Sequence, residues 1–342
     1  METKIFKAPD LSAAAELIQQ GELVAFPTET VYGLGADATN VAAVEKVYKA
    51  KGRPSDNPLI VHVADQATVR QFVTTIQPAV QRLMDTFWPG PLTIILPLQP
   101  GSLALQVTGG LTTAAFRNPR QATTLDLIKT AGVPLVGPSA NTSGKPSPTT
   151  AQHVYHDLKG KIGGILDAGP TDLGVESTVI DMSTAHPAIL RPGAVTRADL
   201  ERVLGPIVDS QKQVKPDEVP KAPGMKYTHY SPTAAVQIVD PKVDWATVVS
   251  WSQQQPTPVG ILATDAVLNH YAWPENVATY SLGTDIHSAS HALFAGLRAF
   301  DLHPDITTIL VEGFSPNGLG EAYMNRLNKA AGQHHFSTAD LR

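Results

Sequence analysis

The sequence Phe26-Pro27-Thr28-Glu29-Thr30-Val31-Tyr32-Gly33-Leu34-Gly35 continues a strand-like apolar run into a turn rich in hydroxyl groups and glycine. A second segment follows it, Lys51-Gly52-Arg53-Pro54-Ser55-Asp56-Asn57-Pro58-Leu59-Ile60-Val61-His62, in which an ammonium, a guanidinium and an amide precede the next strand. Glycine lets backbone N–H groups approach a ligand, and lysine and arginine supply charges that match phosphate or carboxylate oxygens. The two segments therefore predict an anion-binding site, although neither fits the Walker phosphate loop or the Rossmann glycine fingerprint.

Length and composition indicate an ordinary two-domain globular protein. The 342 residues exceed the usual size of a single core, and 42% are hydrophobic and 17% charged. The chain has no cysteine, which excludes disulfides, thiolate metal sites and a cysteine nucleophile. Residues 1–7 lack an apolar signal core, and no apolar run reaches the length of a membrane span. We therefore expect a cytoplasmic enzyme without a membrane partner.

The distribution of charge favours a small anionic ligand over a polyanion. The net charge is −5, and residues 232–342 contain ten acidic and five basic residues. The preceding part of the chain is therefore neutral and gathers lysine and arginine in its loops. This pattern argues weakly against a dedicated nucleic-acid binder.

The apolar periodicity predicts an α/β protein with a twisted mixed sheet in its first part. Strands are expected at 23–26, 59–64, 92–97, 112–117, 133–138, 163–167, 177–182 and 188–191. Helices are expected at 11–20, 40–52, 66–75, 78–87, 124–131, 149–157 and 197–204. Asn40 and Gly52 are suited to cap the second of these helices. Because the motifs fall at strand ends and loops, they lie where ligands usually bind in such sheets.

The remainder of the chain predicts a linker and a second, smaller domain. Residues 206–232 contain proline and lysine without clear periodicity, so we assign the first domain to 1–205 and the linker to 206–232. Residues 233–342 alternate strands at 234–239, 258–263 and 307–313 with helices at 244–254, 287–301 and 319–331. This order is typical of a small Rossmann-like parallel α/β domain.

Several further blocks share one family resemblance. They are Thr113-Ala114-Ala115-Phe116-Arg117, Ser139-Ala140-Asn141-Thr142-Ser143-Gly144-Lys145-Pro146-Ser147-Pro148-Thr149, Gly174-Val175-Glu176-Ser177-Thr178-Val179-Ile180-Asp181, Leu190-Arg191-Pro192-Gly193 and Ala222-Pro223-Gly224-Met225-Lys226-Tyr227-Thr228-His229-Tyr230-Ser231-Pro232. With the two segments above, and in this order, they resemble the threonylcarbamoyl-AMP synthase family in its long, two-domain form. The resemblance implies that residues 1–205 are a YrdC-like catalytic domain.

The resemblance also implies a reaction. It joins L-threonine, bicarbonate and ATP to give threonylcarbamoyl-AMP and pyrophosphate, the activated intermediate for threonylcarbamoyladenosine in tRNA. The implied enzyme class is a nucleotidyltransferase, and magnesium is expected with ATP. The expected partner is the tRNA threonylcarbamoyl-transfer machinery that follows, whereas direct tRNA binding is expected to be weak or absent. In-line attack on a phosphate depends mainly on positioning and charge stabilisation, which fits a site of lysine, arginine, hydroxyls and asparagine.

Individual roles follow from the matched positions. The resemblance implies a threonine pocket of Thr30, His62, Arg117, Ser139 and Ser177. It implies an ATP site of Lys51, Arg53, Asn57, Thr113, Asn141, Ser147, Thr149, Arg191 and Tyr230. Lys51, Arg53 and Arg117 are the candidates for catalytic charge stabilisation, and no protein-built metal site is expected. Residues 221–232 are expected to form a lid that places Tyr230 against the nucleotide.

Other interpretations remain open for single residues and for the whole chain. Taken alone, His62 is a core histidine, and Ser139 and Asn141 are turn residues. Glu176 is expected to be structural. The alternative function is an RNA-binding module, in which a basic concave surface of Lys51, Arg53, Arg117, Lys145 and Arg191 docks a phosphate backbone. A carbamoyl-transfer module of the kind found in hydrogenase-maturation proteins ranks last, because cysteine-rich zinc fingers are absent from the sequence.

Overall fold

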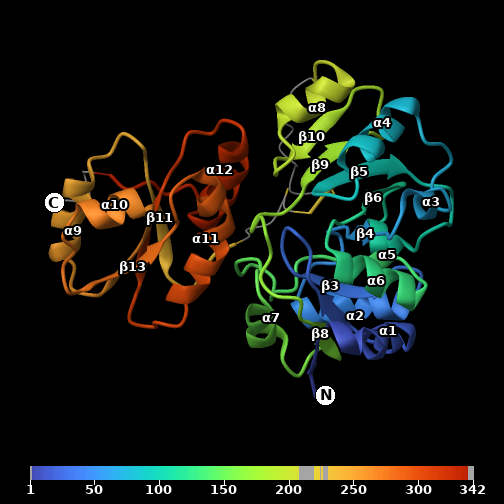
Figure 1. Ribbon diagram of the computed structural model, residues 1–342, viewed down its shortest axis with the longest axis horizontal. Helices are drawn as coiled ribbons and strands as arrows, with labels where there is room; N and C mark the ends of the chain where they lie inside the picture. Colours follow the sequence, from blue (N-terminus) through green and yellow to red (C-terminus); the bar gives the residue numbers. More distant parts are fainter. Residues whose placement is uncertain (1, 208–218, 224, 226–229, 338–342) are drawn as a thin grey trace. The chain divides into compact units, whose positions relative to one another are not determined.

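The computed structural model describes residues 2–207, 219–223, 225 and 230–337 (Figure 1). The chain divides into two compact units. The first comprises Met1–Ser143, Ser147–Asp172 and Glu176–Tyr227, and the second comprises Gly144–Pro146, Leu173–Val175 and Thr228–Arg342. Two short segments that precede residue 176 in the chain thus belong to the second unit.

The first unit is built on a ten-stranded mixed sheet, which confirms the predicted fold class. The strand order is β1-β8-β2-β3-β7-β4-β6-β5-β9-β10. The strands are β1 (Lys4–Phe6), β2 (Val24–Phe26), β3 (Gly33–Asp37), β4 (Ile60–His62), β5 (Leu92–Pro97), β6 (Thr113–Arg117), β7 (Leu135–Val136), β8 (Gly164–Leu166), β9 (Thr178–Asp181) and β10 (Ala188–Arg191). Pairs β4/β6 and β5/β9 are parallel, whereas β2/β3, β4/β7, β5/β6 and β9/β10 are antiparallel.

The helices of this unit cover the sheet unequally. They are η1 (Ala8–Asp10), α1 (Leu11–Gln19), α2 (Val41–Lys51), α3 (Gln66–Val69), α4 (Pro78–Phe87), α5 (Leu105–Thr108), α6 (Ala122–Ala131), α7 (Ala151–Leu158) and α8 (Arg197–Leu204). The main core includes residues of α2, α4, α7 and α8 and lies on one face of the sheet. On the opposite face, α1 and α6 cover β2, β7 and β8. The part of that face formed by β4, β5, β6 and β9 instead carries a small cluster around Ile60, Ile95 and Ala115.

The second unit contains a four-stranded parallel sheet, as its alternating pattern predicts. The order is β11-β14-β12-β13, and each adjacent pair is parallel. The strands are β11 (Ala235–Val239), β12 (Val259–Ala263), β13 (Val277–Ser281) and β14 (Thr308–Glu312), and the helices are α9 (Trp245–Gln253), α10 (Asp265–His270), α11 (Ile286–Phe300) and α12 (Leu319–Ala330). No helix among the described residues is long and apolar enough to cross a membrane.

Strand β3 is the most informative element that the sequence pattern missed. The turn predicted after Phe26 spans residues 27–32, and its glycines Gly33 and Gly35 belong instead to strand β3, paired antiparallel to β2. A Cβ on Gly33 or Gly35 would come within 2.8 or 2.9 Å of the Phe26 ring. These glycines therefore make room for a core phenylalanine, which is a different reason for glycine than close approach to a ligand.

Other differences concern short elements. Strands β1 and β13 and helices α5 and α10 were not predicted, and α3 is shorter than the expected 66–75. Helix α2 matches its prediction closely, because the Asn40 side chain accepts from the Ala43 amide and Gly52 ends the helix in the left-handed conformation.

The cap of α2 gives the first testable expectation. Asn40→Ala should lower the free energy of unfolding by about 1 kcal/mol, because the Ala43 amide loses its side-chain acceptor. The matched control is Gln77→Ala at the start of α4, where the side chain makes no cap hydrogen bond. Urea unfolding of both variants and the parent measures the difference. An equal change in the two variants would contradict the capping role.

Candidate active site

One face of the central sheet gathers polar residues from separate strands. His62 pairs with Arg117 across β4 and β6, and Ile60 pairs with Ala115 in the same register. Because side chains alternate along a strand, His62 and Arg117 share the face that carries the Ile60–Ala115 cluster. Ser177 joins this face through the 2.8 Å hydrogen bond between its hydroxyl and that of Thr93. The structure therefore brings together three residues predicted for the threonine pocket.

Arg117 lies at the centre of this arrangement. Its guanidinium donates from Nη1 to the Thr30 hydroxyl at 2.9 Å, and its Nη2 lies 2.9 Å from Glu29 Oε1. Glu29 and Arg117 are almost fully buried. The second Glu29 oxygen accepts from the Arg120 amide at 3.2 Å. Glu29 thus neutralises Arg117, and sequence reasoning missed this residue although it stands between Thr28 and Thr30 in the opening motif.

His62 is held beside Arg117 in its neutral form. Burial, reinforced by the positive charge of Arg117, lowers the pKa of His62 to about 3. The ring packs edge-on against Phe26 with centroids 5.3 Å apart. A Cβ on Gly137 would lie 2.6 Å from Nδ1, so only glycine leaves room for the imidazole. A neutral imidazole can accept a hydrogen bond as well as donate one.

Lys51 and the Ser139–Asn141 loop form a second cluster. The Lys51 ammonium donates to the backbone carbonyls of Ser139 and Asn141, the latter at 2.6 Å. An isolated bridge between Ser139 and Gly33 ties this loop to the end of β3. The predicted Lys51, Ser139 and Asn141 are therefore neighbours, although the contacts of Lys51 are with carbonyl oxygens.

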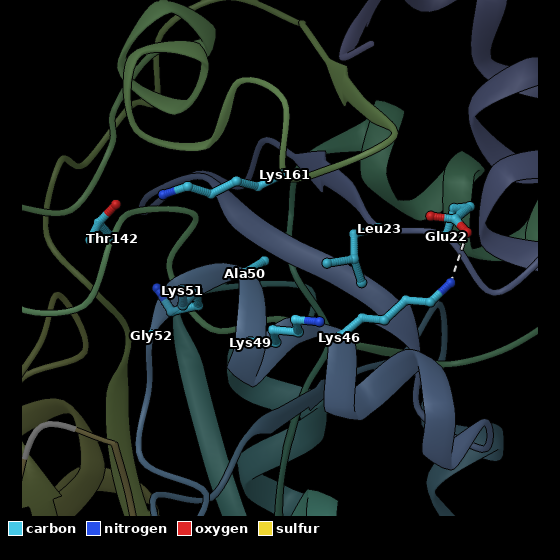
Figure 2. A pocket seen from close by; sticks show the side chains of 9 residues that line it. All are labelled: Glu22, Leu23, Lys46, Lys49, Ala50, Lys51, Gly52, Thr142 and Lys161. Atoms are coloured by element: carbon cyan, nitrogen blue, oxygen red, sulfur yellow. Dashed lines mark hydrogen bonds and ion pairs between the residues drawn. The ribbon is translucent and has the colours of Figure 1, made fainter. Parts of the chain in front are cut away.

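The C-terminal end of α2 borders a cavity of about 540 Å³. Figure 2 shows the side chains that line it. It is lined by Glu22, Leu23, Lys46, Lys49, Ala50, Lys51, Gly52, Thr142 and Lys161. The Lys46 ammonium pairs with Glu22 at 2.7 Å. Because Lys51 is the only predicted site residue in its lining, we do not assign the substrate site to this cavity.

Arg53 and Asn57 shape the loop after α2. Arg53 donates from Nε to the Asn57 carbonyl at 3.3 Å and from Nη2 to the Pro58 carbonyl at 3.1 Å. Asn57 is 1% exposed, and its side-chain oxygen has no hydrogen-bond partner among the described residues. Arg53 therefore braces the loop, while the Asn57 amide is the group left for a ligand.

Arg191 and Glu176 organise the opposite edge of the face. Arg191 donates to the Ser177 carbonyl at 3.0 Å and to the Ser177 hydroxyl at 3.1 Å. The Ser147 hydroxyl donates to Glu176 Oε1 at 2.5 Å. Glu176 is buried, in keeping with the structural role expected for it.

Three further residues are predicted for the nucleotide. Thr113 begins β6, so it lies at the opposite end of that strand from Arg117. The Thr149 hydroxyl and amide both face His153 Nδ1 at 3.3 Å. Tyr230 belongs to the second unit, where it is 4% exposed and its ring lies 5.1 Å from that of Phe294. The assignment of these residues to ATP stays a prediction.

Part of the linker is placed by the structure. Residues 224 and 226–229, with Lys226 and His229 of the lid hypothesis, lie outside the described residues. Ala222 is buried in the Ile60–Ala115 cluster, and Met225 packs against it. Lys221 pairs with Asp181 at 2.9 Å. Lys221, Ala222 and Met225 therefore lie on the face that carries His62 and Arg117, whereas closure over a nucleotide stays a prediction.

The side chains near the site do not build a metal cage. No group of three histidine, aspartate or glutamate residues in the described part of the chain could hold a metal ion. The Glu29 carboxylate pairs with Arg117, and the Glu176 carboxylate accepts a hydrogen bond from Ser147. These residues do not fit a magnesium site made by protein ligands alone.

Comparisons with known proteins decide the family. A family model described as Telomere recombination matches residues 16–193, and one described as Threonylcarbamoyl-AMP synthase, C-terminal domain, matches residues 195–332. The chain belongs to the threonylcarbamoyl-AMP synthase family. The resemblance stated from the sequence motifs is thereby confirmed.

Relatives cover nearly the whole chain. A threonylcarbamoyl-AMP synthase of Bacillus subtilis is 46% identical over 325 residues, which are 95% of this chain and 93% of that protein. The crystal structure of Pyrococcus abyssi Sua5 in complex with L-threonine matches with a TM-score of 0.90 and 40% identity, over 98% of this chain and 99% of that one. A shorter threonylcarbamoyl-AMP synthase of Vibrio vulnificus is 35% identical over 159 residues, which are 46% of this chain and 85% of that protein. The family thus includes long and short members.

The neutral, buried His62 predicts a pH dependence of stability. The pKa of His62 is lower in the folded protein than in the unfolded chain, so protons bind preferentially to the unfolded chain. The contribution of neutral His62 to the free energy of unfolding is therefore fully present above a pH of about 6.5 and is lost as the pH falls towards 3. Between pH 7 and pH 5, His62→Gln should lose about 2 kcal/mol less free energy of unfolding than the parent. Urea unfolding at both pH values measures this. The control is His270→Gln at an exposed position, and equal losses in the parent and His62→Gln would refute the assignment.

Proposed function

We propose that this chain is a nucleotidyltransferase that makes threonylcarbamoyl-AMP and pyrophosphate from L-threonine, bicarbonate and ATP. Family membership and the relatives with this name support the reaction. Threonine binding is supported by the similarity to Sua5 of Pyrococcus abyssi, which was solved in complex with L-threonine. The product serves tRNA threonylcarbamoyladenosine formation, and the transfer machinery that follows is the expected partner.

The observation that carries the proposal is the position of buried polar atoms that lack aligned hydrogen bonds. Among the described residues, these include Glu29 Oε1, Asn57 Oδ1, His62 Nδ1 and Arg117 Nη2. The Glu29 and Arg117 atoms form an ion pair without good hydrogen-bond alignment, and the other two have no partner in the described chain. Buried polar groups are normally satisfied, so such atoms on the neighbouring Glu29, His62 and Arg117 are typical of a ligand site. Three of the four residues are predicted substrate contacts.

The chemistry requires two bond-forming steps. The threonine amine attacks the carbon of bicarbonate, water leaves, and a carbamate forms. A carbamate oxygen then attacks the α-phosphate of ATP, and the bond to pyrophosphate breaks. Neither step needs a covalent intermediate with the protein, so positioning and charge stabilisation supply the acceleration.

The residues of the site suit these demands. Arg117 offers a guanidinium held by Thr30 and Glu29, suited to the threonine carboxylate or the carbamate. Neutral His62 beside it can accept a hydrogen bond from the amino acid. On the nucleotide side, we assign Asn57 and Lys51 to ATP, with Arg53 bracing their loop. Magnesium would enter with ATP, held mainly by phosphates and water, and would neutralise phosphate charge.

The burial of the basic residues weighs against the alternative RNA-binding module. Lys51, Arg53, Arg117 and Arg191 are each at most 9% exposed, and their donors face backbone carbonyls or neighbouring side chains. Lys145 pairs with Asp301. Docking of a phosphate backbone requires exposed cationic groups, so the structure supports a buried site for small anions instead.

The reaction itself has a direct test. Pyrophosphate release from ATP should require threonine and bicarbonate together, and mass spectrometry should detect threonylcarbamoyl-AMP. The kcat/KM for serine should be lower than that for threonine, by an amount that corresponds to about 1–3 kcal/mol of transition-state binding. Serine cannot fill a pocket shaped for the threonine methyl group. Equal pyrophosphate release without threonine would overturn the proposal. RNA affinity that falls steeply with salt, without pyrophosphate release, would favour the alternative.

The two halves of the site should separate by mutation. Asn57→Ala should weaken ATP binding about tenfold and leave threonine binding within about twofold, because only an amide contact to the nucleotide is lost. Thr30→Val is nearly isosteric and removes the hydroxyl that accepts from Arg117, so it should weaken threonine binding preferentially. Isothermal titration calorimetry with each substrate measures both effects. The opposite pattern would show that the pockets are assigned backwards.

A further inference from the structure

The second unit is joined to the site at two peptide bonds. Its segment Gly144–Pro146 is followed directly by Ser147, and its segment Leu173–Val175 is followed directly by Glu176. Ser147 and Glu176 then form the 2.5 Å hydrogen bond described above. Contacts that hold these two segments in place therefore also hold the backbone that leads into Ser147 and into Glu176.

Both segments contact a single face of helix α11. His291, Phe294 and Arg298 are three and four residues apart, which places them on one side of the helix. Asp301, the C-cap, follows three residues later on the same side. We call His291, Phe294, Arg298 and Asp301 the α11 stripe.

Arg298 holds the end of the first segment. It donates from Nε at 3.0 Å and from Nη2 at 2.5 Å to the backbone carbonyl of Pro146. Arg298 is only 8% exposed, so these charge-assisted hydrogen bonds are shielded from water. A planar fork that converges on one carbonyl fixes its direction and therefore the peptide that leads into Ser147.

The rest of the first segment is also anchored. The Lys145 ammonium donates to the Thr233 hydroxyl at 2.7 Å and lies 3.4 Å from Asp301 Oδ2. The Gly144 carbonyl accepts from the Ser231 amide at 2.9 Å. All three residues of the segment thus have hydrogen-bond partners between Ser231 and Asp301.

The second segment touches the stripe at its other end. A Cβ on Gly174 would lie 2.4 Å from the His291 backbone oxygen, and the φ angle of Gly174 is +72°. Both the close approach and the left-handed conformation require glycine. Between the two contacts, the Tyr230 ring packs on Phe294. The stripe therefore contacts three segments, and all three carry or adjoin residues predicted for the nucleotide or its surroundings.

We propose that the α11 stripe is a positioning element for the reaction, with Arg298 orienting Ser147 through the Pro146 carbonyl and the Gly174–His291 contact orienting Glu176. The inference rests on the proposed function, in which Ser147 lies on the nucleotide side. The C-terminal unit then sets the Ser147–Glu176 hydrogen bond and so the direction in which the Ser147 hydroxyl faces ATP. Arg298 is a positioning residue, not a catalytic one.

The test is a double-mutant cycle in the full-length protein with Arg298→Met and Ser147→Ala. Arg298→Met keeps the length of the side chain and removes its donors. It should raise the KM for ATP about tenfold and change the KM for threonine by less than about twofold, the scale of one hydrogen bond to a charged group. In the Ser147→Ala background, the same change should cost less than about twofold, because its effect passes through Ser147. Arg298→Lys should restore part of the loss.

Two further measurements keep the outcomes distinct. Arg202→Met, which alters a largely exposed arginine on α8, is the matched control and should leave both KM values unchanged. Hydrogen exchange of a peptide over 144–149 needs no turnover and should accelerate in Arg298→Met. If the parent makes no threonylcarbamoyl-AMP while exchange still accelerates, the proposed function fails, and what remains is the structural coupling of Arg298 to residues 144–149. Equal KM effects of Arg298→Met in both backgrounds, or unchanged exchange in a folded variant, would overturn the positioning role.

If Arg298→Met does not fold, Gly174→Ala tests the α11 stripe through its contact with His291. It should also raise the KM for ATP selectively, because the added Cβ must displace the backbone of His291 or of its own segment. A folded Gly174→Ala protein with parental kinetics would count against the proposal.

Discussion

The buried ion pair of Arg117 and Glu29 is the interaction on which the site depends. A lone guanidinium in this position would be costly to desolvate, and removing one partner of a buried pair typically costs about 3–5 kcal/mol. Glu29 offsets that cost, and Thr30 and Gly90 accept from the remaining donors. Burial is the main reason for the low pKa of neighbouring His62, and the positive charge of Arg117 lowers it further. The pair therefore holds Arg117 in place beside a neutral imidazole in the predicted threonine pocket.

Glycine residues leave the space that the rings beside Arg117 occupy. Gly33 and Gly35 leave room for the Phe26 ring, Gly137 leaves room for the His62 ring, and the two rings meet edge to face. A side chain at any of these glycines would displace a ring or a backbone oxygen. The glycines of the opening motif therefore serve packing inside the sheet, and through it they determine where His62 stands beside Arg117.

The inward orientation of the basic residues decides what kind of anion the site suits. Lys51, Arg53 and Arg191 direct donors to backbone carbonyls of the loops that surround the face. Such contacts fix loop geometry before a substrate arrives, which reduces the reorganisation needed during reaction. A count of lysine and arginine could not distinguish this from an exposed basic surface, because the sequence does not show which way a side chain turns.

The sequence by itself determined the local elements and the family. Helix α2 follows from Asn40 and Gly52, and the alternation of β4 and β6 follows from their apolar residues, since both depend on neighbours in the chain. Tertiary structure decided the rest. The Glu29–Arg117 pair and the contact of Gly174 with His291 join residues distant in sequence, and β3 forms between β2 and β7, the second of which is about 100 residues away. No local pattern encodes such contacts, because their energy arises only when the folded chain removes both partners from water.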